Sequence, residues 1–248
     1  MLALLAAGAA HAHHEAIFGP QSSLVLSSPA FVSLQTFSRT TVSGTETTGL
    51  VSAGFTPFTS VPLSFTAIVP ATYISPPGKL GREDIILGAR YREGLGGEDG
   101  NFLMGVAAVD VPTGNIDHKA FDGPLILQAA ALASAERRPF SAIAYAYGRR
   151  DPLKGNNLFL GTGFAWTPLD DDADGHLFSL QLGASYEFYT SGTELMAHPT
   201  IVFAPARRLL FFGVVSLPIF HDLADPAQTD RFRIGGGVLV LLGSNPKA

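Results

Sequence analysis

Apolar residues alternate with small or polar residues through HLFSLQLGASYEFYT, residues 176–190. The same alternation returns in DIILGARYR at 84–92, in NLFLGTGFAWT at 157–167 and in RFRIGGGVLVLL at 231–242. Residues i and i+2 share one face of a β-strand. The pattern therefore predicts strands with one bulky apolar face and an opposite face of glycine, serine, threonine and scattered charge.

Strands separated by turn residues are expected along most of the chain. They are predicted near 31–42, 46–56, 62–72, 81–93, 102–112, 124–135, 140–148, 157–167, 176–189, 194–204, 207–217 and 230–242. An even number of antiparallel strands of about ten residues is typical of outer-membrane barrels. A soluble barrel would fill its interior with large apolar groups, so the bulky face is predicted to contact lipid. We expect an all-β fold, a closed antiparallel transmembrane β-barrel of about twelve strands. A soluble barrel or sandwich is the alternative.

Composition supports a membrane barrel. Charged residues make up 15% of the chain, against about 25% in an average soluble domain. Mean hydropathy is positive, yet no run after the N-terminus reaches the roughly 18 apolar residues of a membrane helix. The net charge of −5 and the lack of a basic cluster argue against nucleic acid. The absence of cysteine fits an exported protein that needs no disulfides.

The two ends of the chain differ from its middle. MLALLAAGAAHA ends in a small-x-small pattern and predicts a secretory signal peptide over 1–12. We expect a periplasmic N-terminal segment over 13–29, an outer-membrane barrel over 30–243 and a tail over 244–248. If both termini of the chain lie in the periplasm, the two longest connections, 113–123 and 218–229, face the outside of the cell, as is typical of outer-membrane barrels. Predicted interfacial aromatics are Phe55, Tyr91, Phe102, Phe140, Tyr147, Trp166, Phe188, Tyr189 and Phe232.

Four segments, REDIILGARYR, GVAAVDVPTGN, FLGTGFAWTPL and FRIGGGVLVLLG, resemble the outer-membrane transporter family named for the meta-pathway of phenol degradation. The matching positions are Asp84, Leu87, Gly88, Arg90, Tyr91, Gly105, Pro112, Thr113 and Gly114. The resemblance implies an outer-membrane channel for hydrophobic or aromatic compounds, inserted by the barrel-assembly machinery. One feature departs from many such barrels: the chain continues past Leu242 as GSNPKA instead of ending in an aromatic residue.

Motifs for metal or catalysis are weak. DDDADG at 170–175 matches half of a calcium loop, but Gln181 stands where the bidentate glutamate belongs, so an acidic turn is favoured. HAHHE at 11–15 suits Cu(II) or a soluble polar tail, and Phe18 breaks the zinc motif HExxH. His176 and His198 have no serine partner that the sequence identifies. We therefore expect no metal, no cofactor and no enzyme.

Charged residues on the inner face are the predicted pore-lining and solute-contacting residues. They are Arg39, Arg90, Arg92, Asp110, Glu187, Arg231 and Arg233. Pairing of the first strand with the last should gather Arg39, Arg231 and Arg233 at the outer mouth. Two hypotheses follow: acids such as Asp110, Glu187 or Asp222 neutralise the cluster, or the cluster attracts anions.

The predicted function is a passive outer-membrane channel for small, aromatic or hydrophobic solutes, with lipid around the barrel. A structural or partner-docking barrel is the alternative, with Ile17, Phe18 and Pro20 as a docking or plug segment. An outer-membrane enzyme that uses His198 is the third hypothesis.

Overall fold

The computed structural model describes residues 30–41, 43–57, 63–95, 101–116, 123–152, 155–171, 176–206, 208–224 and 230–242. Its strands are β1 (Ala30–Thr41), β2 (Thr45–Phe55), β3 (Leu63–Ser75), β4 (Lys79–Arg82), β5 (Ile85–Gly94), β6 (Phe102–Val111), β7 (Ile126–Arg137), β8 (Phe140–Asp151), β9 (Gly155–Asp171), β10 (His176–Tyr189), β11 (Gly192–Ala206), β12 (Leu209–Leu223) and β13 (Asp230–Leu242). No helix in these ranges is long and apolar enough to cross a membrane.

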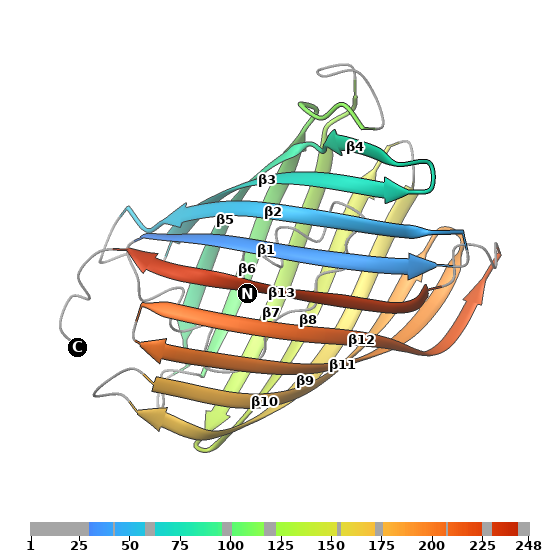
Figure 1. Cartoon of the computed structure of the whole chain (residues 1–248). Helices are drawn as coiled ribbons and strands as arrows, with labels where there is room; N and C mark the ends of the chain where they lie inside the picture. The colour runs from blue at the N-terminus through green and yellow to red at the C-terminus, as the bar shows by residue number, and fades with distance from the viewer. Residues whose placement is uncertain are drawn as a thin grey trace.

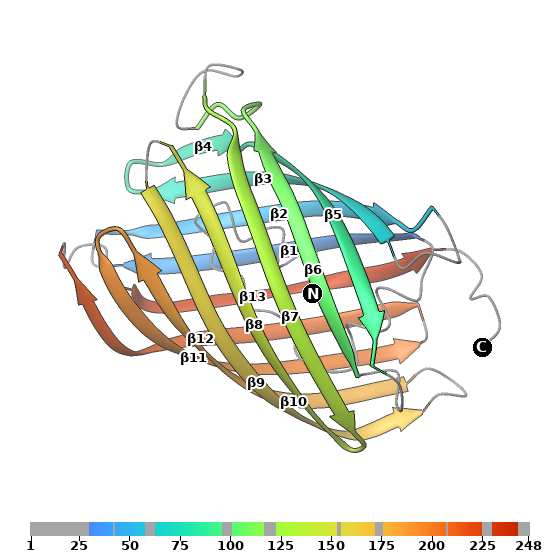
Figure 2. The same cartoon turned by 180° about the vertical axis from the view of Figure 1, so that it is seen from behind.

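The strands form one closed antiparallel barrel (Figures 1 and 2). β1 closes it against β13. The short β4 pairs with the second half of β3 and β5 pairs with the first half, so these two strands share one of twelve places in the ring. Closure gives the strand amides partners within the protein, as a lipid environment requires. The predicted all-β barrel of about twelve strands is confirmed.

The register of β1 and β13 distinguishes the two ends of the barrel. Ala30 and Leu242 are register partners at one end, called the near end. The opposite end, where β1 turns into β2, is called the far end. The predicted topology places the near end in the periplasm and the far end outside the cell.

The predicted strand 81–93 is interrupted. It breaks at Glu83 and Asp84 into β4 and β5, because the segment after β6 bonds into the gap. The Gly114 N–H donates to the Asp84 carboxylate at 2.9 Å, and the Ile85 N–H donates to Thr113 Oγ1 at 3.0 Å. The backbone beside Gly114 is so close that an added Cβ would lie 2.6 Å from a Glu83 backbone atom. Two of the segments that carry the family resemblance, REDIILGARYR and GVAAVDVPTGN, are therefore joined by hydrogen bonds.

β12 is longer than predicted. The predicted strand ends at 217, before Pro218, a residue that cannot donate to a β-ladder. Instead β12 continues to Leu223, and its register against β11 shifts between the pairs Leu195–Phe220 and Met196–Pro218. This bulge accommodates Pro218 in the ladder, so the strand continues past it. The predicted outward connection is correspondingly shorter.

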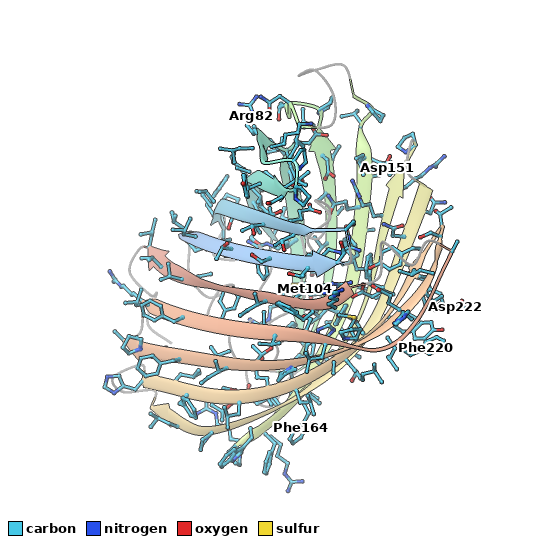
Figure 3. The ribbon with its side chains drawn as sticks, turned by 45° about the vertical axis from the view of Figure 1, so that its right-hand side comes forward. Arg82, Met104, Asp151, Phe164, Phe220 and Asp222 are labelled. Carbon is cyan, nitrogen blue, oxygen red and sulfur yellow. The ribbon has the colours of Figure 1, made fainter. Side chains whose placement is uncertain are left out.

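Large apolar side chains cover the outer surface of the barrel. Leu182, near the middle of β10, is 60% exposed, and the labelled Phe164 of β9 is also exposed (Figure 3). On the four strands that define the sequence pattern, many of the bulky residues predicted to face outward are exposed, although Arg231, predicted on the inner face, is exposed as well. Exposed members on these strands include Leu87, Tyr91, Leu158, Leu160, Phe164, Trp166, Leu180, Leu182, Phe232, Ile234, Val240 and Leu242. A continuous apolar surface of this kind is the lipid-facing band of an outer-membrane barrel.

The expectation of a small, polar inner face fails on other strands. Phe102, Met104 and Val106 of β6 and Leu210 and Phe212 of β12 are all buried inside the barrel. Both faces of these strands are apolar in sequence, so alternation alone could not choose between them. The prediction that Phe102, Tyr147 and Tyr189 belong to the interfacial aromatics is wrong. Phe102 and Tyr147 are buried in the interior, and the Tyr189 hydroxyl bonds to the buried Glu187 and Arg233.

Aromatic rings pack against glycines of the neighbouring strand on the inner wall. Phe31 lies over Gly54 and Phe37 over Gly235, and each ring and glycine are direct register partners. An added Cβ would lie 2.2 Å from the Phe31 ring at Gly54 and 2.1 Å from the Phe37 ring at Gly235. These glycines therefore allow large rings to lie flat against the wall.

Candidate functional site in the barrel interior

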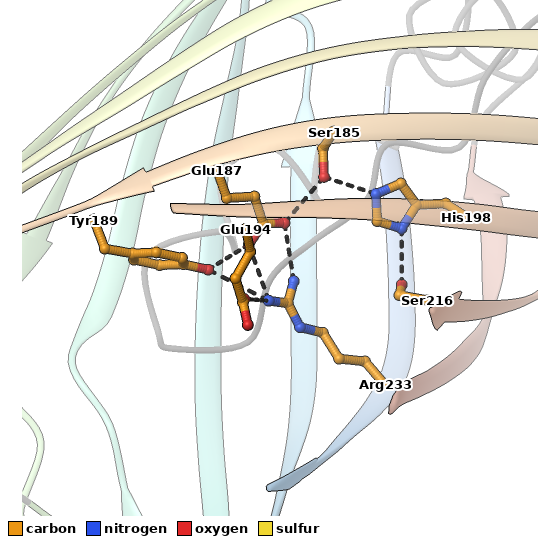
Figure 4. A network of polar contacts seen from close by, with 7 residues as sticks. All are labelled: Ser185, Glu187, Tyr189, Glu194, His198, Ser216 and Arg233. Carbon is orange, nitrogen blue, oxygen red and sulfur yellow. Dashed lines mark hydrogen bonds and ion pairs between the residues drawn. The ribbon is translucent and has the colours of Figure 1, made fainter. Parts of the chain in front are cut away.

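An ion-pair network lies on the wall of β10 to β13 toward the far end (Figure 4). The Arg233 guanidinium donates to both Glu187 carboxylate oxygens at 2.9 Å and to Glu194 Oε2 at 2.9 Å. Tyr189 donates its hydroxyl proton to Glu187 and accepts from Arg233 at 3.3 Å. Glu187 and Glu194 are opposite each other in the hairpin register, and neither side chain is exposed. Two like charges so placed need the cation between them.

A hydrogen-bond chain extends this network toward β12. Ser185 donates to Glu187 Oε1 at 3.0 Å, so its 2.7 Å bond to His198 Nε2 uses an Nε2–H donor. The Ser216 hydroxyl then donates to His198 Nδ1 at 2.9 Å. A nucleophilic serine would instead give its proton to the histidine. The structure thus supplies the serine partners that the sequence could not identify, in an arrangement typical of a structural network.

A second network lies on β6, β7 and β8, also toward the far end. Arg149 lies 3.8 Å from an Asp110 carboxylate oxygen and 3.4 Å from one of Asp151. Gln128 donates to Asp110 and accepts from the Tyr147 hydroxyl at 3.1 Å. As in the first network, two carboxylates accompany one guanidinium.

A row of aromatic rings connects the two networks. The Phe159 ring centroid is 5.4 Å from that of Tyr147 and 5.8 Å from that of Tyr189. Each tyrosine belongs to one of the networks, and Phe159 on β9 lies between them. The far half of the barrel is therefore lined by charged side chains that are already paired, with rings between them.

Arg90 and Arg92 occupy a different environment, toward the near end on β5. Arg90 is 1% exposed, and its Cζ lies 5.2 Å from the Phe31 ring centroid. Arg92 lies two residues further along the same face, with its Cζ 4.3 Å from the Phe102 ring centroid. Both guanidinium groups are within cation–π distance of a ring.

The predicted arginine cluster at the far end forms only in part. Arg39 and Arg233 are direct register partners, and both line a small far-end pocket together with Glu46 and Ser216. Arg231 is exposed and does not line this pocket. Arg233 is paired with Glu187, which was one of the acids proposed to neutralise the cluster.

The other acids do not take that role. Asp110 pairs with Arg149 on another wall, and Asp222 lies opposite Thr193 at the end of the β11–β12 pair. Sequence reasoning missed Glu194 and Arg149. The β10–β11 hairpin register would have placed Glu194 opposite Glu187, and the alternation through β8 would have turned Arg149 inward.

Several predicted features lie outside the described residues. These are the signal peptide, the 13–29 segment with its histidines and docking residues, the 172–175 part of the acidic turn and the 244–248 tail. His176 is exposed at the start of β10. Among residues that the structure describes, no group of three or more histidine, cysteine or acidic side chains could hold a metal ion.

Comparison with solved structures finds barrels of the same kind. An outer membrane channel from Pseudomonas putida F1 superposes with a TM-score of 0.65 at 11% identity, over 87% of this chain and 96% of that chain. The KdgM porin, in complex with disordered oligogalacturonate, gives 0.57 at 11% identity, over 86% of this chain and 100% of that chain. The NanC porin gives 0.54 at 9% identity, over 85% and 100%. The fold is that of an outer-membrane barrel. Comparison with protein-family models and with curated proteins finds no match.

Proposed function

We propose that the protein is a narrow passive channel of the outer membrane for small solutes. The observation that carries the proposal is the lining of the closed barrel. Charged and hydroxyl side chains of β5 to β13 face inward while the outer surface is apolar. A barrel that only filled space would have no need for ion pairs in its interior, because buried charges are costly unless they are paired.

The solute class follows from the interior and from the family resemblance. Phe31, Phe37 and Phe102 line the same interior as the charged residues. Aromatic rings beside polar groups suit small solutes with an apolar body, in keeping with the hydrophobic or aromatic compounds that the resemblance implies. Outer-membrane lipid is the partner of the exposed belt, and the barrel-assembly machinery is the proposed insertion factor.

A structural or partner-docking barrel is the second candidate. The apolar cluster inside the barrel, which includes Leu50, Ile68 and Ile86, favours it, because tightly packed side chains narrow a lumen.

Solute flux into liposomes separates the two candidates. Liposomes containing the folded protein should admit small aromatic solutes faster than liposomes containing a heat-denatured sample, with flux falling steeply as solute size increases. Liposomes that stay impermeable to every small solute, although the protein is folded in them, would support the structural barrel.

A further inference from the structure

Arg90 is a buried cation, and among the residues that the structure describes no carboxylate pairs with it. Its Nε and Nη1 atoms have no hydrogen-bond partner, and its one described interaction is with the face of the Phe31 ring. By contrast, Arg233 and Arg149 each contact two carboxylates. A buried charge left unpaired destabilises a protein, so a guanidinium of this kind points to a ligand that supplies the missing charge.

Two further hydroxyl groups beside Arg90 have no hydrogen-bond partner within the described part of the chain. Ser64 of β3 is the direct register partner of Arg90, and Thr66 follows on the same face, opposite Gly88. Ser64 Oγ and Thr66 Oγ1 are buried without a hydrogen bond. Three side chains on two neighbouring strands therefore present unused donors to one region of the interior. Guanidinium and hydroxyl donors together match the oxygens of a carboxylate.

The apolar part of the site comes from Phe31 and Phe102. The Phe31 ring is held over Gly54 and beside Arg90, and the Phe102 ring lies beside Arg92. Arg92 is only partly buried and adds a second positive charge toward the near end. These surroundings offer donors for a carboxylate at one end of a ligand and rings for a flat apolar body at the other.

We propose that Arg90, with Ser64 and Thr66, binds the carboxylate of a small aromatic acid inside the near half of the barrel. This inference rests on the proposed channel function and names its substrate class. The selectivity site is thereby at the near end, and the far-end arginines do not form it.

Equilibrium binding in detergent micelles tests the site without requiring ion flow. Benzoate is titrated into folded protein by calorimetry, with benzyl alcohol as its neutral counterpart. We expect benzoate to bind the native protein and the Arg150→Gln control, which removes an exposed positive charge of β8. Arg90→Gln should weaken benzoate binding about tenfold or more, since hydrogen bonds to charged groups are lost. Arg90→Lys should retain part of the affinity.

Equal benzoate affinity in native protein and Arg90→Gln, or equal binding of benzyl alcohol and benzoate, would overturn the site. Heat-modifiable migration on gels checks that each variant is folded. If Arg90→Gln does not fold, the Ser64→Ala, Thr66→Ala double variant takes its place, with a loss of about threefold to tenfold expected. Benzoate binding that depends on Arg90, without solute flux, would refute the channel function and support the binding site. Solute flux without benzoate binding would support the channel function and refute the binding site.

Discussion

The two halves of the barrel interior contain the same residue types in different arrangements. At the far end, Arg233 lies between Glu187 and Glu194, and Arg149 lies between Asp110 and Asp151. At the near end, Arg90 is as deeply buried, and its partner among the described residues is the Phe31 ring. Charges that are paired with carboxylates hold a wall together, whereas a charge without a counter-ion is available to a solute. The position of arginine in the lumen therefore does not define its role; its partners do.

The largest effect should come from removing the central cation of the far-end network. Arg233→Gln leaves Glu187 and Glu194 opposite each other without a counter-charge, which should cost about 3–5 kcal/mol in the free energy of unfolding. Arg90→Gln should cost far less or should stabilise the barrel, because it removes an unpaired buried charge. Urea unfolding in lipid vesicles measures both. Equal losses for the two variants would remove the distinction between the ends.

A charge placed on the outer surface should have the next largest effect on the free energy of unfolding. The far-end network and Arg90 both lie inside the barrel, so the outer surface should contact lipid. Leu182→Arg, near the bilayer centre, should cost about 2–4 kcal/mol in vesicles. The matched change Leu158→Arg lies near the far end of its strand and should cost about 0–1 kcal/mol. Similar folding free energies for the two variants would contradict the placement of the lipid-facing band.

Alanine substitutions at two inner-wall glycines should distinguish the near and far ends of the barrel by their effect on benzoate binding. Gly54→Ala and Gly235→Ala each force a large ring away from the wall and should cost about 1–3 kcal/mol. Gly105→Ala is the control, because nothing lies within 4 Å of its added Cβ. Only Gly54→Ala displaces Phe31, so it alone should also weaken benzoate binding. Benzoate binding that is weakened by Gly235→Ala and unchanged in Gly54→Ala would contradict a near-end site.

The smallest expected effect concerns the serine–histidine chain. Ser216→Ala removes the donor to His198 Nδ1 and should cost about 0.5–1.5 kcal/mol. Benzoate binding and solute flux should stay unchanged, because the chain belongs to the far-end wall. A hydrolase assay with short acyl esters completes the comparison: esterase activity that disappears in Ser185→Ala would revive the enzyme hypothesis.

Sequence periodicity predicts the barrel well because the lipid-facing residues are bulky on most strands. Leu87 and Tyr91 of β5, or Leu180 and Leu182 of β10, could hardly be turned inward. It fails where both faces are apolar, as at Phe102 and Met104, and where a distant segment interrupts a strand, as Gly114 does at Asp84.

The residue types of the site were predictable, and Glu187 was one of three acids named as a partner for the arginine cluster, but the sequence could not select it among them. Glu187 and Arg233 were both expected on the inner face, yet they are 46 positions apart and their contact depends on the tilt and register of four strands. Arg90 shared its inward placement with Arg233 in the sequence pattern. The difference lies in their described partners: Arg233 pairs with Glu187 and Glu194, whereas Arg90 lies beside the Phe31 ring.

The reversal potential in a planar bilayer under a salt gradient tests the central claim most directly. The account predicts a measurable current with a preference for anions that falls in Arg90→Gln. It also predicts no change in the Arg39→Gln, Arg231→Gln double variant, whose residues lie at the far end. A preference that depends on Arg39 and Arg231 and is unaffected by Arg90 would contradict the near-end site, and a folded protein that carries no current would contradict the channel itself.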